Sequence, residues 1–175
     1  MKKVLFYTNQ FFGQIGGEDK AYEKPIIKAG PVGPANGFTG KLENAEIVAT
    51  ILCGDNYYVE NMDQAKAFIK AQLDHYKIDL FIAGPAFNAG RFGIACGDAC
   101  AFVKKEAGIE TMTALYWENP AVEMYKREIY ILETGKSAAT MKKAIEAMVP
   151  FANKLLSGQA LGTPTQEGYF AKGKR

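Results

Sequence analysis

Two segments of the chain combine polar side chains with the glycines of tight turns. The first, Asn9–Asp19, ends in the acid pair Glu18 and Asp19, and the second, Gly84–Arg91, ends in a guanidinium. An arginine side chain matches a carboxylate in a planar, two-point grip. Arg91 therefore predicts a site for a small carboxylate. The alternative, that Arg91 pairs with one of the two acids, stays open, and both interpretations hold if the acids position the arginine.

The predicted site includes further amide and carboxylate side chains. They come from the same two segments and from a third one that follows a later strand. These additional candidate substrate-binding residues are Asn9, Gln10, Asn88, Glu118 and Asn119.

The cysteines are a separate question. Cys96 and Cys100 stand four residues apart and so share one helix face. A redox pair is conceivable, but buried small apolar side chains are the commoner outcome. Cys96 is also a candidate catalytic residue, because it lies nearer the start of its helix, where the pKa of a thiol can fall. With Cys53 and the single histidine, His75, the chain lacks a set of zinc ligands, so no metal is expected.

Apolar runs and helical periodicity alternate along the chain. Runs that are apolar on both faces indicate strands buried between layers of helices, as in a parallel sheet. Five strands are expected, at Val4–Thr8, Ile47–Cys53, Leu80–Ala83, Thr111–Tyr116 and Glu128–Leu132. Three helices are expected, after Asn61, from Asn88 to Ala107, and after Ser137.

This alternation predicts an α/β fold, a three-layer sandwich around a five-stranded, mostly parallel sheet in the flavodoxin-like order 2-1-3-4-5. In that order the sheet reverses between the first and third strands, and ligands bind at the reversal, beyond the carboxyl ends of the strands. The segments Asn9–Asp19 and Gly84–Cys96 follow those two strands. The unusual residues therefore coincide with the predicted cleft.

The helix expected from Asn88 to Ala107 contains Gly90, Gly93 and Gly97. A glycine inside a helix costs about 1 kcal/mol relative to alanine. These glycines predict close packing on the sheet or a ligand that approaches the backbone.

Familiar ligand sites of this architecture fit poorly. Gly135-Lys136-Ser137 lacks the earlier glycine of a phosphate-binding loop, because Tyr130 stands there, so Ser137 is expected as a helix N-cap. The turn after the first strand offers only one hydroxyl for a flavin phosphate, and the third strand ends without the aspartate of a receiver domain.

Composition describes an ordinary globular chain of 175 residues, 48% hydrophobic and 23% charged, with a formal net charge of +2. One α/β domain is expected over 1–156, followed by an irregular tail or linker over 157–175. No apolar run approaches the ~20 residues of a membrane helix, and the small net charge argues against nucleic acid as a partner. Three cysteines, an odd number, indicate free thiols and a cytoplasmic location.

The chain resembles a known family through four sequence motifs that occur in the family's order, which makes the resemblance specific. The chain resembles, from Met1 to about Tyr169, the N-terminal part of selenoprotein B of the glycine, sarcosine and betaine reductases, whose members are longer. The motifs that carry the resemblance are Asn9–Ala21, Cys53–Tyr57, Gly84–Gly93 and Glu118–Pro120.

The resemblance implies a component of a complex that reductively cleaves the C–N bond of an amino acid. A pyruvoyl group on a partner subunit holds the amine, and a selenol captures the carboxymethyl fragment. The family's selenocysteine motif lies in the C-terminal half and is not found in this chain, and Cys96 and Cys100 do not match it. No cofactor is expected in this chain. Selenocysteine and the pyruvoyl group are expected on other chains or on a missing segment.

The resemblance leaves open whether the chain is a separate subunit, a stand-alone relative, a fragment or a shortened gene product. The preferred interpretation is an N-terminal, substrate-side domain that works with other subunits on a small amine or carboxylate. Two alternatives stay open. One is a non-catalytic module that binds such a ligand, and the other is a structural subunit.

Overall fold

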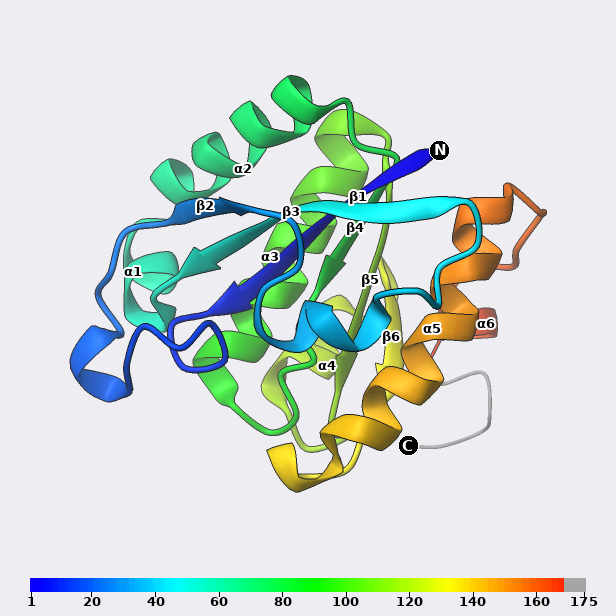
Figure 1. Ribbon diagram of the computed structural model, residues 1–175. Coiled ribbons are helices and arrows are strands. Elements are labelled where there is room, and N and C mark those ends of the chain that lie inside the picture. The colour runs from blue at the N-terminus through cyan, green and yellow to red at the C-terminus, as the bar shows by residue number, and fades with distance from the viewer. Residues whose placement is uncertain (169–175) are drawn as a thin grey trace.

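The computed structural model describes residues 1–168, which form one six-stranded sheet with helices on both faces (Figure 1). The strands are β1 (Lys2–Asn9), β2 (Ile26–Ala29), β3 (Ala45–Cys53), β4 (Leu80–Ala83), β5 (Glu110–Leu115) and β6 (Tyr130–Glu133). The α-helices are α1 (Asp55–Glu60), α2 (Met62–Tyr76), α3 (Gly90–Ala107), α4 (Pro120–Tyr125), α5 (Met141–Ser157) and α6 (Pro164–Glu167). Three short 3₁₀ helices are η1 (Glu18–Lys20), η2 (Gly33–Phe38) and η3 (Ala138–Thr140).

The strand order is β2-β3-β1-β4-β5-β6, with β2 antiparallel to β3 and all other neighbours parallel. The predicted five-stranded order 2-1-3-4-5 is therefore wrong for the sheet as a whole, because β2 adds a sixth strand at its edge. The parallel strands alone run β3-β1-β4-β5-β6. β2 has only four residues and no buried side chain, so its apolar run is too short to have indicated a strand.

The direction in which the chain builds the sheet reverses at β1. The chain passes from β1 to β3 on one side and then crosses back to β4 on the other side. The carboxyl ends of all three strands meet at one edge of the sheet, because the strands are parallel. Ligand sites of open α/β sheets form at such an edge.

Both faces of the parallel strands are buried because helices cover each of them (Figure 1). Leu5 and Tyr7 of β1 pack toward α1, α2, α3 and α4, whereas Val4 and Phe6 pack toward α5 and η2. This alternation follows from the two-residue period of a strand. It explains why the buried strands read as continuously apolar in sequence.

The three expected helices are present as α2, α3 and α5. Ser137 accepts a hydrogen bond from the backbone N–H of Ala139, but it caps η3, the short turn that leads into α5. The division of the chain at residue 156 stays a prediction. Within the predicted tail, α6 lies against β6, and 169–175 fall outside the described residues. None of the helices in the described part is long and apolar enough to cross a membrane.

Candidate functional site

Polar groups from the segments that follow β1, β3 and β4 meet where these strands end. Asn9, the last residue of β1, donates a hydrogen bond from Nδ2 to Oδ2 of Asp55 at 3.1 Å. The backbone N–H of Asp55 donates to Oε1 of Gln10 at 3.0 Å. The ends of β1 and β3 are thereby joined through side chains as well as through the sheet.

Asp55 is the buried acid of this cluster, and sequence reasoning missed it as a site residue. Only 7% of its surface is exposed, and none of the described residues donates a hydrogen bond to its Oδ1. Burial raises the pKa of this carboxyl from 3.8 to about 6, although hydrogen bonding with the side chains of Asn9 and Gln10 and the charge of Arg91 act in the opposite direction. Its position two residues after the end of a buried strand, within the Cys53–Tyr57 motif, was the available signal.

Arg91 lies in the first turn of α3 and connects three elements. Its Nη2 donates to both carboxylate oxygens of Glu18 in η1, at 3.1 and 3.2 Å, and its Nη1 donates to Oδ1 of Asn56 in α1. Both charged side chains are accessible, with exposed fractions of 48% for Arg91 and 76% for Glu18. The pairing that the sequence left open is therefore present. Asp19 instead accepts a hydrogen bond from the backbone N–H of Gly17.

The side chain of Asn119 forms its hydrogen bonds with backbone groups. It is buried, and its Nδ2 donates to the carbonyl oxygens of Phe87 and Ala89, both at 3.0 Å. Its Oδ1 accepts from the backbone N–H of Ala121, so it also caps α4. Asn119 thus positions the loop between β4 and α3, and its polar atoms are already occupied.

The other predicted residues lie at the same edge without such links. Asn88 is half-buried and Glu118 is exposed, and in the described structure neither side chain forms a hydrogen bond. The binding roles of the predicted residues stay predictions.

The loop that follows β4 turns sharply at Gly84. Its φ of +95° lies in the left-handed region, and a Cβ there would stand 3.0 Å from the backbone nitrogen of Ala86. Glycine is required at this turn, which directs the following residues toward α3.

The three cysteines are buried and unpaired. Burial raises the pKa of Cys96, and the neighbouring Cys100 raises it further, so its place near a helix start does not produce a reactive thiolate. Burial raises the pKa of Cys53 to about 12, and Cys100 hydrogen-bonds the carbonyl oxygen of Met112. Within residues 1–168 no group of three or more His, Cys, Asp or Glu residues is arranged to hold a metal ion.

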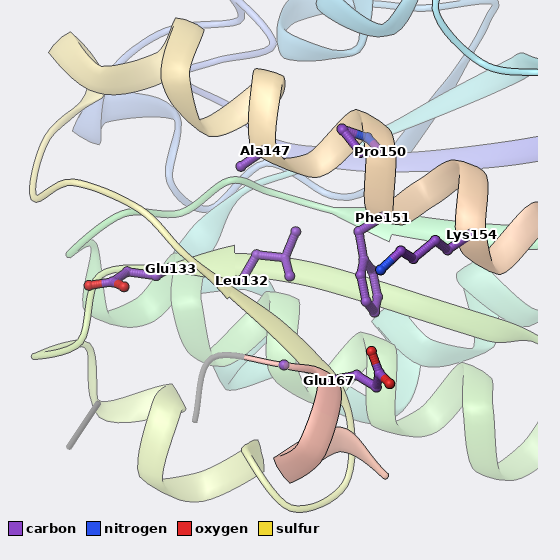
Figure 2. Close-up of a pocket in the computed structure, with 8 residues that line it drawn as sticks. Leu132, Glu133, Ala147, Pro150, Phe151, Lys154 and Glu167 are labelled. Carbon is purple, nitrogen blue, oxygen red and sulfur yellow. The ribbon is translucent and has the colours of Figure 1, made fainter. Parts of the chain in front are cut away.

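Two of the hollows in the described structure lie apart from the polar cluster formed by Asn9, Gln10, Glu18, Asp55, Asn56 and Arg91. One, of about 320 Å³, lies between β6, α5 and α6, and Figure 2 shows Lys154 and Glu167 entering it from opposite sides. The other, of about 510 Å³, is an open groove lined by Phe12 and Gln14 together with η2 and the start of α5. Neither hollow is lined by a predicted site residue.

Comparison with known proteins gave consistent matches. The family model described as glycine/sarcosine/betaine reductase selenoprotein B matches residues 1–175. The "Glycine reductase complex component B subunit gamma" of Carboxydothermus hydrogenoformans is 50% identical over 99% of this chain and 40% of its own length.

Two of the other relatives are reductase subunits from Peptoclostridium acidaminophilum. Its "Betaine reductase complex component B subunit beta" is 45% identical over 100% of this chain, and its "Sarcosine reductase complex component B subunit beta" is 44% identical over 99%. The chain spans about 40% of the length of these relatives. No solved structure matched the chain.

Proposed function

This chain belongs to the glycine/sarcosine/betaine reductase selenoprotein B family, and on that premise we propose that it is the substrate-side component of an amino-acid reductase complex. The complex reductively cleaves the C–N bond of a small amino acid. The observation that carries the proposal for this chain is the polar cluster of Arg91, Asn56 and Asp55 at the edge where the direction of the sheet reverses.

The cluster suits a ligand that has both a carboxylate and a cationic nitrogen. Arg91 supplies a permanent positive charge, and its contact with Asn56 holds the guanidinium in place before a ligand arrives. Asp55 supplies a buried carboxylate whose Oδ1 lacks a donor among the described residues, and the protonated amine of glycine or sarcosine is a suitable donor. The residues of this chain therefore bind and orient the ligand.

The reactive groups come from elsewhere. A selenol acts as a soft nucleophile, but all three thiols of this chain are buried with raised pKa values, so none can replace it. Selenocysteine and the pyruvoyl group belong to other chains or to a segment outside this one. The partners are the other subunits of the complex rather than nucleic acid or a membrane. The free thiols are consistent with a cytoplasmic location.

Isothermal titration calorimetry with glycine, sarcosine, betaine and acetate tests the binding role. Arg91→Ala should weaken binding about 10- to 150-fold, because it removes a charge-assisted pair. Arg91→Lys should not restore full affinity, because lysine lacks the planar fork. Arg127→Ala, which removes an exposed arginine between α4 and β6, is the matched control and should bind as wild type does.

Equal affinity in wild type and Arg91→Ala would place the ligand elsewhere. Absence of binding by the wild-type chain would contradict the proposed role and favour a structural subunit.

A further inference from the structure

The contact between Arg91 and Glu18 does not have the strongest geometry open to the two groups. An arginine and a carboxylate bind best through two parallel N–H···O bonds from two nitrogens. Here both oxygens of Glu18 share Nη2, because Nη1 is engaged by Asn56. Both oxygens of the Glu18 carboxylate therefore depend on a single nitrogen of Arg91.

Exposure weakens the contact further. With exposed fractions of 48% and 76%, the pair is screened by solvent, and pairs of this kind contribute little to stability. Glu18 begins the three-residue helix η1. The following turn is fixed separately, since Ala21 is fully buried and its carbonyl oxygen accepts from two N–H groups in the first turn of α1. Glu18 can leave Arg91 without disturbing the sheet.

The second acid near Arg91 is Asp55, which is buried and lacks a hydrogen-bond donor for one of its oxygens among the described residues. Asp55 lies close enough to both Arg91 and Glu18 for each charge to act on it, and its Oδ1 has no hydrogen-bond donor among the described residues. Because that oxygen is covered, a ligand nitrogen reaches it only when a neighbouring group moves. Glu18 is the exposed member of this group, and it carries the same functional group as the ligand.

We propose that Glu18 is an internal competitor, whose carboxylate occupies the position on Arg91 that the carboxylate of the ligand takes. The inference rests on the proposed function, since it assumes that Arg91 binds a ligand carboxylate. The ligand replaces Glu18 on Nη2, Asn56 keeps its hold on Nη1, and η1 moves away from α3. The Arg91–Glu18 pair is thus the resting state of the site.

Glu18→Gln tests this role by calorimetry with acetate and glycine. Removing the competing charge should raise the affinity about two- to fivefold, which is the value of an exposed ion pair. Glu23→Gln is the matched control, because it removes an equal charge from the same region while Glu23 pairs with Lys20 rather than Arg91. In an Arg91→Ala background, Glu18→Gln should give no gain.

The outcomes separate the two proposals. If wild type binds through Arg91 but Glu18→Gln binds equally or more weakly, Glu18 is not a competitor, and the proposed function still stands. If neither protein binds, both proposals fail.

A second measurement follows the segment itself. Saturating acetate should speed hydrogen exchange at the amides of Lys20 and Ala21, whose hydrogen bonds belong to η1 and its end. Unchanged exchange on binding would overturn the displacement of Glu18.

Discussion

Burial of the Asp55 carboxyl raises its pKa from 3.8 to about 6, and the shift has a definite consequence for stability. Between these two values the folded protein holds a proton that the unfolded chain has already released. The free energy of unfolding therefore falls as the pH rises through this window. Above about pH 6 the full loss of stability remains. A shift of this size corresponds to about 3 kcal/mol. Such a cost is typical of groups retained for function rather than for stability.

Asp55→Asn should remove that cost, because an amide is neutral at every pH and its oxygen can still accept the hydrogen bond from Asn9. Urea unfolding at several pH values between 4 and 7.5 provides the test. The variant should gain stability over wild type as the pH rises, by up to about 3 kcal/mol at pH 7.5. A difference between the two proteins that does not vary with pH would contradict the raised pKa.

Sequence reasoning selected Arg91 and Glu18 as candidates but not Asp55, for a physical reason. Arginine and acids in glycine-rich turns are recognisable locally, whereas the burial of Asp55 depends on Asn9 and Gln10, which lie some 45 residues earlier in the chain. Asn119 is the reverse case, and its binding role stays a prediction. Its type and place predicted a ligand contact, but the nearest acceptors are backbone carbonyls that only the folded chain brings together.

At the scale of elements, two of the three glycines of α3, Gly93 and Gly97, are explained by close packing against 119–125, the segment that forms α4 and its N-cap. A Cβ on Gly93 would stand 2.4 Å from the side-chain atoms of Asn119, and one on Gly97 would stand 2.2 Å from the ring of Tyr125. The sequence indicated close approach but could not name the partner, because α4 is a six-residue helix without a periodic pattern of its own.

Gly93→Ala should destabilise the protein by about 2–4 kcal/mol, because Asn119 must give up hydrogen bonds to make room. Gly90→Ala is the matched control within the same helix, since the nearest atom to its Cβ is 4.0 Å away. That variant should be neutral or more stable by up to about 1 kcal/mol. Thermal unfolding of the two variants distinguishes them, and equal melting temperatures would contradict the close packing of α3 on Asn119.

The elements that were predicted are those with an apolar signal of their own. β1, β3 and β4 are buried on both faces, so their sequences are continuously apolar. β2 and α1 lack this signal. β2 depends on hydrogen bonds to β3, and α1 is anchored by the carbonyl oxygen of Ala21.

At the scale of the whole molecule, the isolated chain should not cleave glycine, sarcosine or betaine, even with excess dithiol. The reaction needs an exposed nucleophile of low pKa, and the three thiols are buried with raised pKa values. Release of ammonia, methylamine or trimethylamine measures the reaction. It should appear once a selenol-bearing chain and an amine-binding partner are added. Amine release by the isolated chain, lost in Cys96→Ser, would contradict this assignment of roles.

The anchoring of Ala21 also determines how strongly Glu18 competes. Because the chain is fixed three residues after Glu18, its carboxylate remains near Arg91 even when the two are apart. A group on a short tether acts as though it were dissolved at a local concentration in about the millimolar range. Because an exposed ion pair is worth only about two- to fivefold in affinity, this competition raises the free ligand concentration that half-fills the site by the same factor. On this proposal the site responds to abundance, so that a plentiful carboxylate ligand fills it, whereas a scarce one leaves Arg91 paired with Glu18.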